Sequence, residues 1–356
     1  MKHVSNKSPH LPTGYYTPRE GSESALHPRS KTVGYSGRCG DKNPRIVFWG
    51  TPEFSVPALS EVLNAGMEVV AVVTNPPRPV GRAQILSPTP VKEFALNHGI
   101  KIFQPETLRD PEFVRMLRDL DSDLFLVAAY GKIIPDEILG IPRHGALNIH
   151  PSLLPKYRGA SPIESAILAG EKETGVTIML MDKEMDHGPI LTQARLRIED
   201  RDTGQTLSKR LAKLGAECAK NAIPAWLQGS LEPAPQDHAF ATYTKILKKE
   251  DGKLTWDKTA EELERQIRAY LRWPESHCFW QRDRDALRLK IEAARAIPST
   301  RVNPPGTVWR AEGTPMAVET AKGALAVDRL CPAGGKSMTA EEFIRGHPDI
   351  IGAVLL

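Results

Sequence analysis

The amino-acid sequence predicts an α/β protein with a doubly wound sheet domain followed by a smaller β-barrel domain. Four short apolar runs alternate with segments of helical patterning; these runs lie at 46–49, 69–73, 101–103 and 124–128. Runs that are apolar throughout suit central parallel strands, so their alternation with helices predicts a doubly wound sheet. Short runs separated by glycine and proline turns predict the barrel; they lie near 279, 287–291, 306–309, 316–318 and 325–327.

Capping residues set the expected boundaries of the helices. Thr51 is the expected N-cap of the first helix, Pro52 its first residue and Gly66 its end. A last short helix begins at Thr339, which forms a capping box with Glu342. The remaining patterns predict helices at 53–65, 91–98, 111–120, 203–228 and 260–270, and strands at 145–150, 174–181 and 190–198.

The first strand–helix turn argues against a dinucleotide cofactor. Gly50 is the single glycine in residues 50–53, where a GxGxxG fingerprint needs three. Without those glycines the backbone cannot approach a pyrophosphate closely. We therefore expect neither NAD nor FAD, and no other nucleotide cofactor.

The chain divides by composition into four stretches. Residues 1–44 lack apolar periodicity, and we interpret them as a disordered N-terminal extension. The sheet domain is predicted at 45–229, a linker at 230–243 and the barrel domain at 244–356. Seven Lys/Arg against three Asp/Glu in residues 1–44 account for the whole net charge of +4, which makes that charge weak evidence for nucleic-acid binding. The barrel domain, with 19 basic and 16 acidic residues, is the better candidate to meet a polyanion.

Composition also bears on the compartment. No run of about 18 apolar residues is present, so no membrane-spanning helix is expected. The four cysteines form no CxxC pair, which argues against a structural zinc site or a disulfide framework. Their scatter favours the reducing cytoplasm.

Polar residues gather at the end of one predicted strand. Asn148 and His150 lie two residues apart in the run 145–150, so they point to the same face, and Pro151 ends the strand. Asp186 follows the end of the run 174–181. If the two strands are neighbours in one sheet, a carboxylate, an imidazole and a carboxamide meet at its end. We interpret Asn148, His150 and Asp186 as a candidate catalytic set.

This set suits the attack of an amine on an acyl carbon, which develops an oxyanion and a surplus proton. His150, supported by Asp186, would handle the proton while Asn148 donates a hydrogen bond to the oxygen. A covalent acyl-enzyme is not expected, because no GxSxG elbow and no cysteine lies near His150. His144, His150 and His187 lack paired metal-ligand spacing, so no metal is expected.

A long proline-rich loop at 75–90 leaves the carboxyl end of the second predicted strand. Ligands bind at that edge in open α/β sheets, and loops of this length are often functional. Its arginines, Arg78 and Arg82, are either phosphate contacts or solvated surface residues.

The motif Asn148-x-His150-x-Ser152-Leu153-Leu154-Pro155, followed by Arg158-Gly159 and by Asp186 in a Met-Asp-x-x-x-Asp-x-Gly context, resembles the folate-dependent formyltransferases. The likeness runs from residue 45 to about 346. Its supporting stretches are 50–54, 78–82, 90–92, 103–105, 129–131, 157–160, 173–179, 273–274 and 332–336. The stretches in the second domain narrow the resemblance to the tRNA-directed branch and its nearest relatives.

The resemblance implies a Rossmann-like catalytic domain, an OB-like tRNA-binding domain, and transfer of the formyl group of 10-formyltetrahydrofolate to the free amine of methionine on initiator tRNA, for translation initiation. It gives catalytic roles to Asn148, His150 and Asp186. It assigns contact with the folate donor to Ser152, Leu153, Leu154 and Pro155, and contact with the tRNA to the loop that carries Arg78 and Arg82. It also implies a monomer in the cytoplasm, with the folate as a co-substrate and no metal.

Some positions depart from the family pattern, and other functions stay open. Pro151 and Glu184 stand where glycine is usual, His187 replaces a small residue or threonine, and Gln84 and Ile85 replace lysines of some relatives. A 10-formyltetrahydrofolate hydrolase is one alternative, although the amide at position 148 argues against it. A glycinamide-ribonucleotide or nucleotide-sugar formyltransferase and a non-catalytic tRNA- or folate-binding module are the others.

Overall fold

The computed structural model describes residues 43–77, 79–80, 85–282, 285–311 and 313–356. The chain divides into two units, residues 1–40 and 41–356, and all described residues belong to the second. The predicted disorder of residues 1–44 therefore concerns a stretch that lies almost wholly outside the described residues. Within the described part of the chain, no helix is long and apolar enough to cross a membrane.

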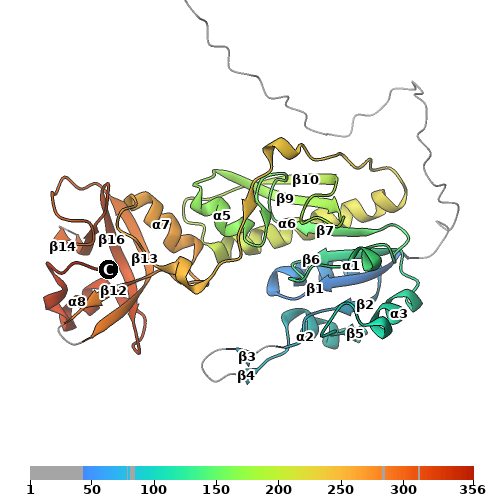
Figure 1. Cartoon of the computed structure of the whole chain (residues 1–356), viewed down its shortest axis with the longest axis horizontal. Helices are drawn as coiled ribbons and strands as arrows, with labels where there is room; N and C mark the ends of the chain where they lie inside the picture. The colour runs from blue at the N-terminus through green and yellow to red at the C-terminus, as the bar shows by residue number, and fades with distance from the viewer. Residues whose placement is uncertain (1–42, 78, 81–84, 283–284, 312) are drawn as a thin grey trace, which may run out of the picture. The chain divides into compact units, whose positions relative to one another are not determined.

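Seven strands form the sheet of the first domain, in the order β10-β9-β7-β6-β1-β2-β5 (Figure 1). Their bounds are β1 Arg45–Gly50, β2 Glu68–Val73, β5 Ile102–Phe103, β6 Leu124–Ala128, β7 Ala146–His150, β9 Glu173–Leu180 and β10 Ile190–Arg197. Within this order, the neighbours β5, β2, β1, β6 and β7 pair in parallel. Strand β9 is antiparallel to both of its neighbours, β7 and the edge strand β10. The chain moves from β1 outward to β5 and then from β6 outward in the other direction, which is the doubly wound order. The predicted fold class is confirmed for this domain.

Helices cover both faces of this sheet and enclose two apolar layers. Ile46 and Phe48 point to the layer that contains α1 and α6, whereas Val47 and Trp49 point to the layer of α3 and α4. The helix bounds are α1 Val56–Asn64, α2 Pro90–Asn97, α3 Pro111–Asp119, α4 Asp136–Leu139, α5 Pro162–Leu168 and α6 Gly204–Leu227. This two-sided burial explains why the strand runs are apolar throughout.

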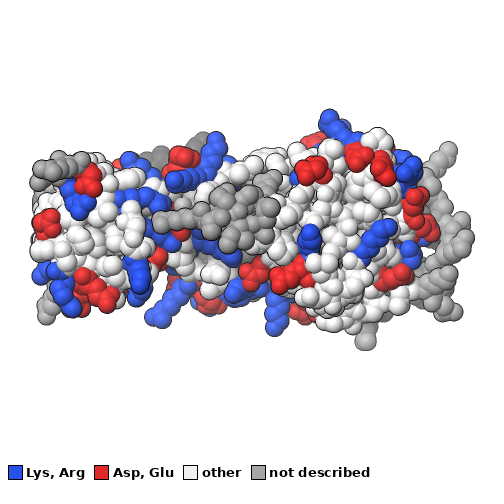
Figure 2. Space-filling model, turned by 90° about the horizontal axis from the view of Figure 1, so that it is seen from below, with Lys and Arg blue, Asp and Glu red and all other residues white. Residues whose placement is uncertain are grey.

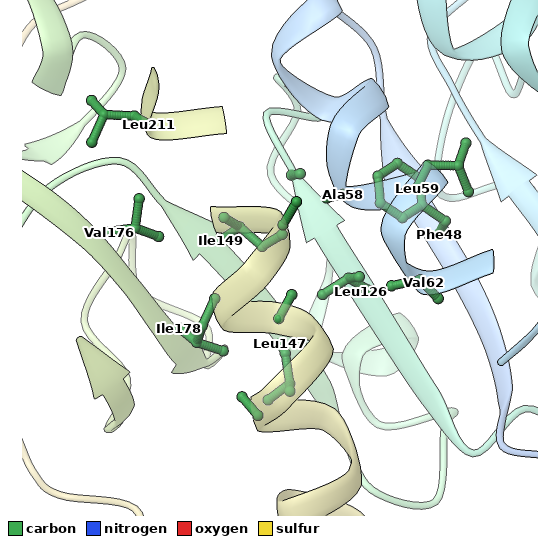
Figure 3. Close-up of a cluster of buried hydrophobic side chains, with 14 of the residues drawn as sticks. Phe48, Ala58, Leu59, Val62, Leu126, Leu147, Ile149, Val176, Ile178 and Leu211 are labelled. Atoms are coloured by element: carbon green, nitrogen blue, oxygen red, sulfur yellow. The ribbon is translucent and has the colours of Figure 1, made fainter. Parts of the chain in front are cut away.

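The layer of α6 fixes which residues of β7 face the site. Leu147 and Ile149 belong to this core, which Figure 3 shows in close-up. The helix lies close to β7, because a Cβ added at Gly215 would come within 2.7 Å of Ile149 Cγ2. Side chains alternate along a strand, so Asn148 and His150 point to the opposite face.

The predicted N-cap of the first helix is wrong. A 3₁₀ turn at Glu53–Ser55 precedes α1, and the cap positions of these two elements are Pro52 and Ser55. The Thr51 hydroxyl donates instead to the carbonyl of Tyr130, at 3.2 Å, and accepts a hydrogen bond from the Asn75 side chain. The local capping pattern is thus overridden by partners that are distant in the sequence.

The second domain is built on an antiparallel sheet in the order β12-β13-β16-β15-β14, with β17 paired to β16. Its elements are α7 Ala260–Ala269, β12 His277–Gln281, β13 Ala286–Ile297, β14 Val308–Ala311, β15 Thr314–Glu319, β16 Ala324–Pro332, β17 Met338–Thr339 and α8 Ala340–Gly346. The last residues of the chain join its two edges: Leu356 exchanges two hydrogen bonds with Phe279 on β12, and Leu355 N donates to Gly306 O next to β14. The sheet is therefore closed into a barrel, as predicted. The capping box of Thr339 and Glu342 at the start of α8 is also confirmed.

A half-buried acid in α5 makes the stability of the fold depend on pH. Burial raises the pKa of the Glu164 carboxyl above its ordinary value. The folded state thus keeps this proton at pH values where the unfolded chain has lost it, so this group lowers stability as pH rises from about 4. We expect Glu164→Gln to raise the melting temperature at pH 8 and to change it little at pH 4. Thermal unfolding at the two pH values, with the exposed Glu112→Gln as control, measures this difference. A gain in melting temperature that is equal at both pH values would contradict the assignment.

Candidate active site

The carboxyl end of β7 carries the first two site residues. Asn148 is half-buried and His150 is only 4% exposed. Pro151, which has no backbone N–H to donate, follows them, and Ser152 N then donates to His150 O in a tight turn. Both side chains thus stand on one face of β7, as the sequence predicts.

Asp186 joins them, although not for the reason expected. The strand β9 is a neighbour of β7, but it is antiparallel: Leu180 lies opposite Leu147, and Thr177 lies opposite His150. The end of β9 therefore lies beside the start of β7, away from His150. The loop 181–189 folds back and brings Asp186 Oδ1 to 3.3 Å from Asn148 Nδ2 and 3.5 Å from His150 Nδ1. The three predicted residues do meet, and the loop rather than a strand end brings them together.

The second nitrogen of His150 has a fixed partner. His150 Nε2 lies 2.9 Å from the carbonyl oxygen of Tyr157. Because a carbonyl oxygen only accepts hydrogen bonds, Nε2 must carry a proton, which leaves Nδ1 to face Asp186 and Asn148. Tyr157 is itself held by a bond from its hydroxyl to Glu171, at 2.7 Å, and burial together with this bond raises the pKa of its phenol. The backbone carbonyl of Tyr157 thus orients the imidazole, and the bond from its hydroxyl to Glu171 anchors the residue.

The segment 152–155, predicted to contact the folate donor, is tied to the sheet. Ser152 is fully buried, and its hydroxyl donates to Lys156 O at 2.6 Å. Thr177 Oγ1 donates to Ser152 O and accepts from Leu154 N, and Leu154 is also buried. Leu153 and Pro155 are the half-buried members of the segment. Leu153 and Pro155 are thus the members of the segment with more exposed surface, and the contact of the whole segment with the folate donor stays a prediction.

Three further residues belong to the site and were not singled out as site residues from the sequence. Arg158, 1% exposed, follows Tyr157, and Gly159 N donates to Asp186 Oδ2 at 2.8 Å. Gln236, from the predicted linker, donates from Nε2 to Asp186 O at 2.9 Å. The Arg-Gly pair stands in the quoted motif and could have been found there. Gln236 carries no local signal, since it sits in a stretch that is typical of a solvated connection.

The linker is hydrogen-bonded to the first domain beside the site. Strand β11, Tyr243–Thr244, begins at the last residue of the predicted linker and pairs in parallel with β8, Arg158–Gly159. The Thr244 hydroxyl donates to Arg158 O, and Thr242 Oγ1 accepts from Tyr157 N. The segment 157–159, whose Gly159 contacts Asp186, is thus held by residues that lie 85 and 86 positions later in the chain.

The predicted tRNA contacts Arg78 and Arg82 lie outside the described residues. Of their loop, the structure gives two short strands, β3 Pro79–Val80 and β4 Ile85–Leu86, which pair in antiparallel fashion. In the described ranges, no three His, Cys, Asp or Glu side chains gather in a way that could hold a metal ion.

Comparison with known proteins identifies the family. Residues 44–223 match the formyl transferase family, and residues 246–348 match the formyl transferase C-terminal domain. A methionyl-tRNA formyltransferase of Chloroflexus aurantiacus is 44% identical over 310 residues, covering 86% of this chain and 98% of the relative. The chain belongs to the methionyl-tRNA formyltransferase family. The Bacillus subtilis methionyl-tRNA formyltransferase is 42% identical, with 87% of this chain and 97% of that protein covered.

Solved structures share the fold of this formyltransferase at low identity. An N-formyltransferase of Helicobacter canadensis, crystallised with folinic acid and dTDP-3-aminofucose, has a TM-score of 0.56 and 20% identity, covering 80% of this chain and 99% of the other. The sugar 3N-formyl transferase WlaRD has a TM-score of 0.55 and 22% identity, covering 80% and 98%. These likenesses support the fold alone.

Proposed function

We propose that this formyltransferase moves the formyl group of 10-formyltetrahydrofolate to the free amine of methionine on initiator tRNA. The observation that carries the proposal is identity of 41–45% to methionyl-tRNA formyltransferases along both domains. The meeting of Asn148, His150 and Asp186 supplies the chemistry. Folate is a co-substrate here.

The reaction sets three tasks for the site. A bond forms between the amine nitrogen and the formyl carbon, the bond from that carbon to the donor nitrogen breaks, and one proton passes from the attacking to the departing nitrogen. Asn148 Nδ2 and His150 Nδ1 face the same small volume, since both lie within 3.5 Å of Asp186 Oδ1. We assign Asn148 to the developing oxyanion and His150 to the proton.

Asp186 stabilises the imidazolium that forms when His150 accepts the proton. With Nε2 bonded to Tyr157 O and Nδ1 facing the carboxylate, both N–H groups of a protonated ring have acceptors. The ring can therefore hold the proton between its removal from the amine and its delivery to the donor nitrogen. Low exposure of His150, at 4%, limits loss of that proton to water.

We also propose the arrangement of the chain around this chemistry. Residues 45–229 form the catalytic domain, 230–243 the linker and 244–356 the tRNA-binding domain, and the enzyme acts as a monomer in the cytoplasm. Leu153 and Pro155 are the candidate side-chain contacts of the donor, and Arg78 and Arg82 those of the tRNA acceptor end. Light scattering of the purified protein tests the monomer.

Binding of tRNA should make the reaction sensitive to salt. Lys and Arg are interspersed with Asp and Glu over the described residues of the face drawn in Figure 2. Each phosphate contact releases counterions, which predicts a KM for tRNA that rises as salt is raised from 50 to 200 mM. The KM for the folate donor serves as the control, because it should change much less. Equal salt dependence of the two KM values would argue against a polyanionic substrate.

An activity assay distinguishes formyl transfer to tRNA from hydrolysis of the folate donor. With 10-formyltetrahydrofolate and charged initiator tRNA we expect formyl-methionyl-tRNA to accumulate. Uncharged tRNA is the matched control, since it lacks the amine. Formate release that is independent of tRNA would identify a hydrolase and overturn the proposal.

A further inference from the structure

The backbone of Asp186 needs support from outside its own loop. Its φ is +51°, in the left-handed region that is sparsely populated for residues other than glycine, even though aspartate enters it more often than most. Such a conformation persists only where surrounding contacts fix it. Gly159 N holds the carboxylate through Oδ2, but a bond to a side chain does not by itself fix the main chain.

Gln236 supplies the missing hold on the main chain. Gln236 is 5% exposed, and its Nε2 donates to two carbonyls of the loop, Asp186 O at 2.9 Å and Gly188 O at 2.7 Å. Its Oε1 accepts from Arg158 Nε at 3.2 Å and from Arg158 Nη2 at 2.7 Å. The orientation of the amide is unambiguous, because carbonyls only accept and a guanidinium only donates.

These bonds close a ring around Asp186. Its carboxylate accepts from Gly159, which is covalently joined to Arg158; the Arg158 guanidinium holds Gln236, and Gln236 returns to the Asp186 carbonyl. Arg158 is itself oriented by two other neutral acceptors, His238 Nδ1 at 2.8 Å and the Tyr243 hydroxyl at 3.3 Å. Hydrogen bonds therefore connect both the side chain and the main chain of Asp186 to the segment Arg158–Gly159.

We propose that Gln236 is a positioning residue for formyl transfer, acting through Asp186. This inference rests on the proposed function and adds a role for the linker: the interdomain segment sets the place of the carboxylate that faces His150. A displacement of about 1 Å at a reacting group costs roughly 10²-fold in rate, so loss of this hold is expected to be visible in kcat.

Gln236→Glu removes the hydrogen-bond donor of the side chain and keeps its acceptor. A carboxylate still accepts from Arg158, and does so more strongly, but it cannot donate to the carbonyls of Asp186 and Gly188. We expect kcat for formyl-methionyl-tRNA formation to fall about 10- to 100-fold, with the KM for tRNA nearly unchanged. The exposed Gln205→Ala, on the first turn of α6, is the matched control and should keep wild-type kcat.

A double-mutant cycle separates positioning from general damage to the fold. If Gln236 acts through Asp186, then Gln236→Glu should cost little further activity in an Asp186→Asn background. Multiplicative losses in the double variant would overturn the inference, as would wild-type kcat in Gln236→Glu. Gln236→Ala, measured alongside, covers the case in which the glutamate variant fails to fold. Failure of the wild-type protein to formylate methionyl-tRNA would instead defeat the proposed function.

Discussion

Replacement of Asp186 by asparagine is expected to lower kcat for formyl transfer by about 10²-fold or more, because general acid–base assistance is worth roughly 10²- to 10⁴-fold. The carboxylate uses both oxygens: Oδ1 faces Asn148 and His150, and Oδ2 accepts from Gly159. An asparagine side chain has one acceptor oxygen and no charge. If that oxygen stays on Gly159, an NH₂ group faces the donor of Asn148; if the amide flips, it opposes the N–H of Gly159. Either way the protonated form of His150 loses its counterion.

The measurement is single-turnover formylation with saturating donor and tRNA, which isolates the chemical step. Thermal unfolding should show little change, since the two side chains are nearly the same size. Asp110→Asn is the matched control: Asp110 caps α3 by accepting from Glu112 N, and asparagine caps a helix equally well. Wild-type turnover in Asp186→Asn would remove Asp186 from the mechanism.

Local sequence rules correctly placed Asn148 and His150, but they did not predict how Asp186 reaches them. Alternation along a strand placed Asn148 and His150 on one face, and the proline after His150 ended the strand. Those rules involve neighbouring residues only. The position of Asp186 depends on a loop that returns across β7, and the hold on that loop comes from Gln236, 50 residues later. No local pattern encodes a contact of this separation, so the expected meeting was correct while the expected route was wrong.

The fold divides in the same way. Apolar runs and helical patterns predicted most of the strands and the longer helices, and the one predicted capping box marked the start of α8, because propensity and capping are local. The short helices α4 and α5 were not predicted. Thr51 failed as an N-cap because its hydroxyl has partners in Tyr130 and Asn75, which become neighbours only once the sheet has formed. The closure of the barrel by Leu355 and Leu356 could likewise not be predicted from the sequence, because backbone hydrogen bonds do not depend on residue type.

We expect Gly188→Ala, which adds one methyl group to the loop that carries Asp186, to lower both the stability of the protein and its kcat. A Cβ at this position would collide with the carbonyl oxygen of Leu180 and would lie 3.1 Å from its carbonyl carbon. Both are backbone atoms at the end of β9, where Leu180 N is bonded to Pro189 O, so they cannot turn aside as a side chain would. The loop must shift instead, and the carbonyl of Gly188 is one of the two that Gln236 holds. We expect a loss of about 1–3 kcal/mol in the free energy of unfolding and roughly 10²-fold in kcat.

The losses of stability and of kcat expected in Gly188→Ala have one cause, which is the shift of the loop. The atoms nearest to the added methyl belong to Leu180 and Asp182, and the substitution leaves Asn148, His150 and Asp186 themselves unchanged. A drop in kcat therefore reports the position of the loop and not the removal of a reacting group. Gly346→Ala in α8 is the matched control, because a Cβ there meets nothing within 4 Å and alanine favours a helix. Urea unfolding and single-turnover rates of the two variants give the comparison. A Gly188→Ala protein that is destabilised but turns over at the wild-type rate would show that catalysis tolerates a displaced Asp186, which is incompatible with a carboxylate that must face His150.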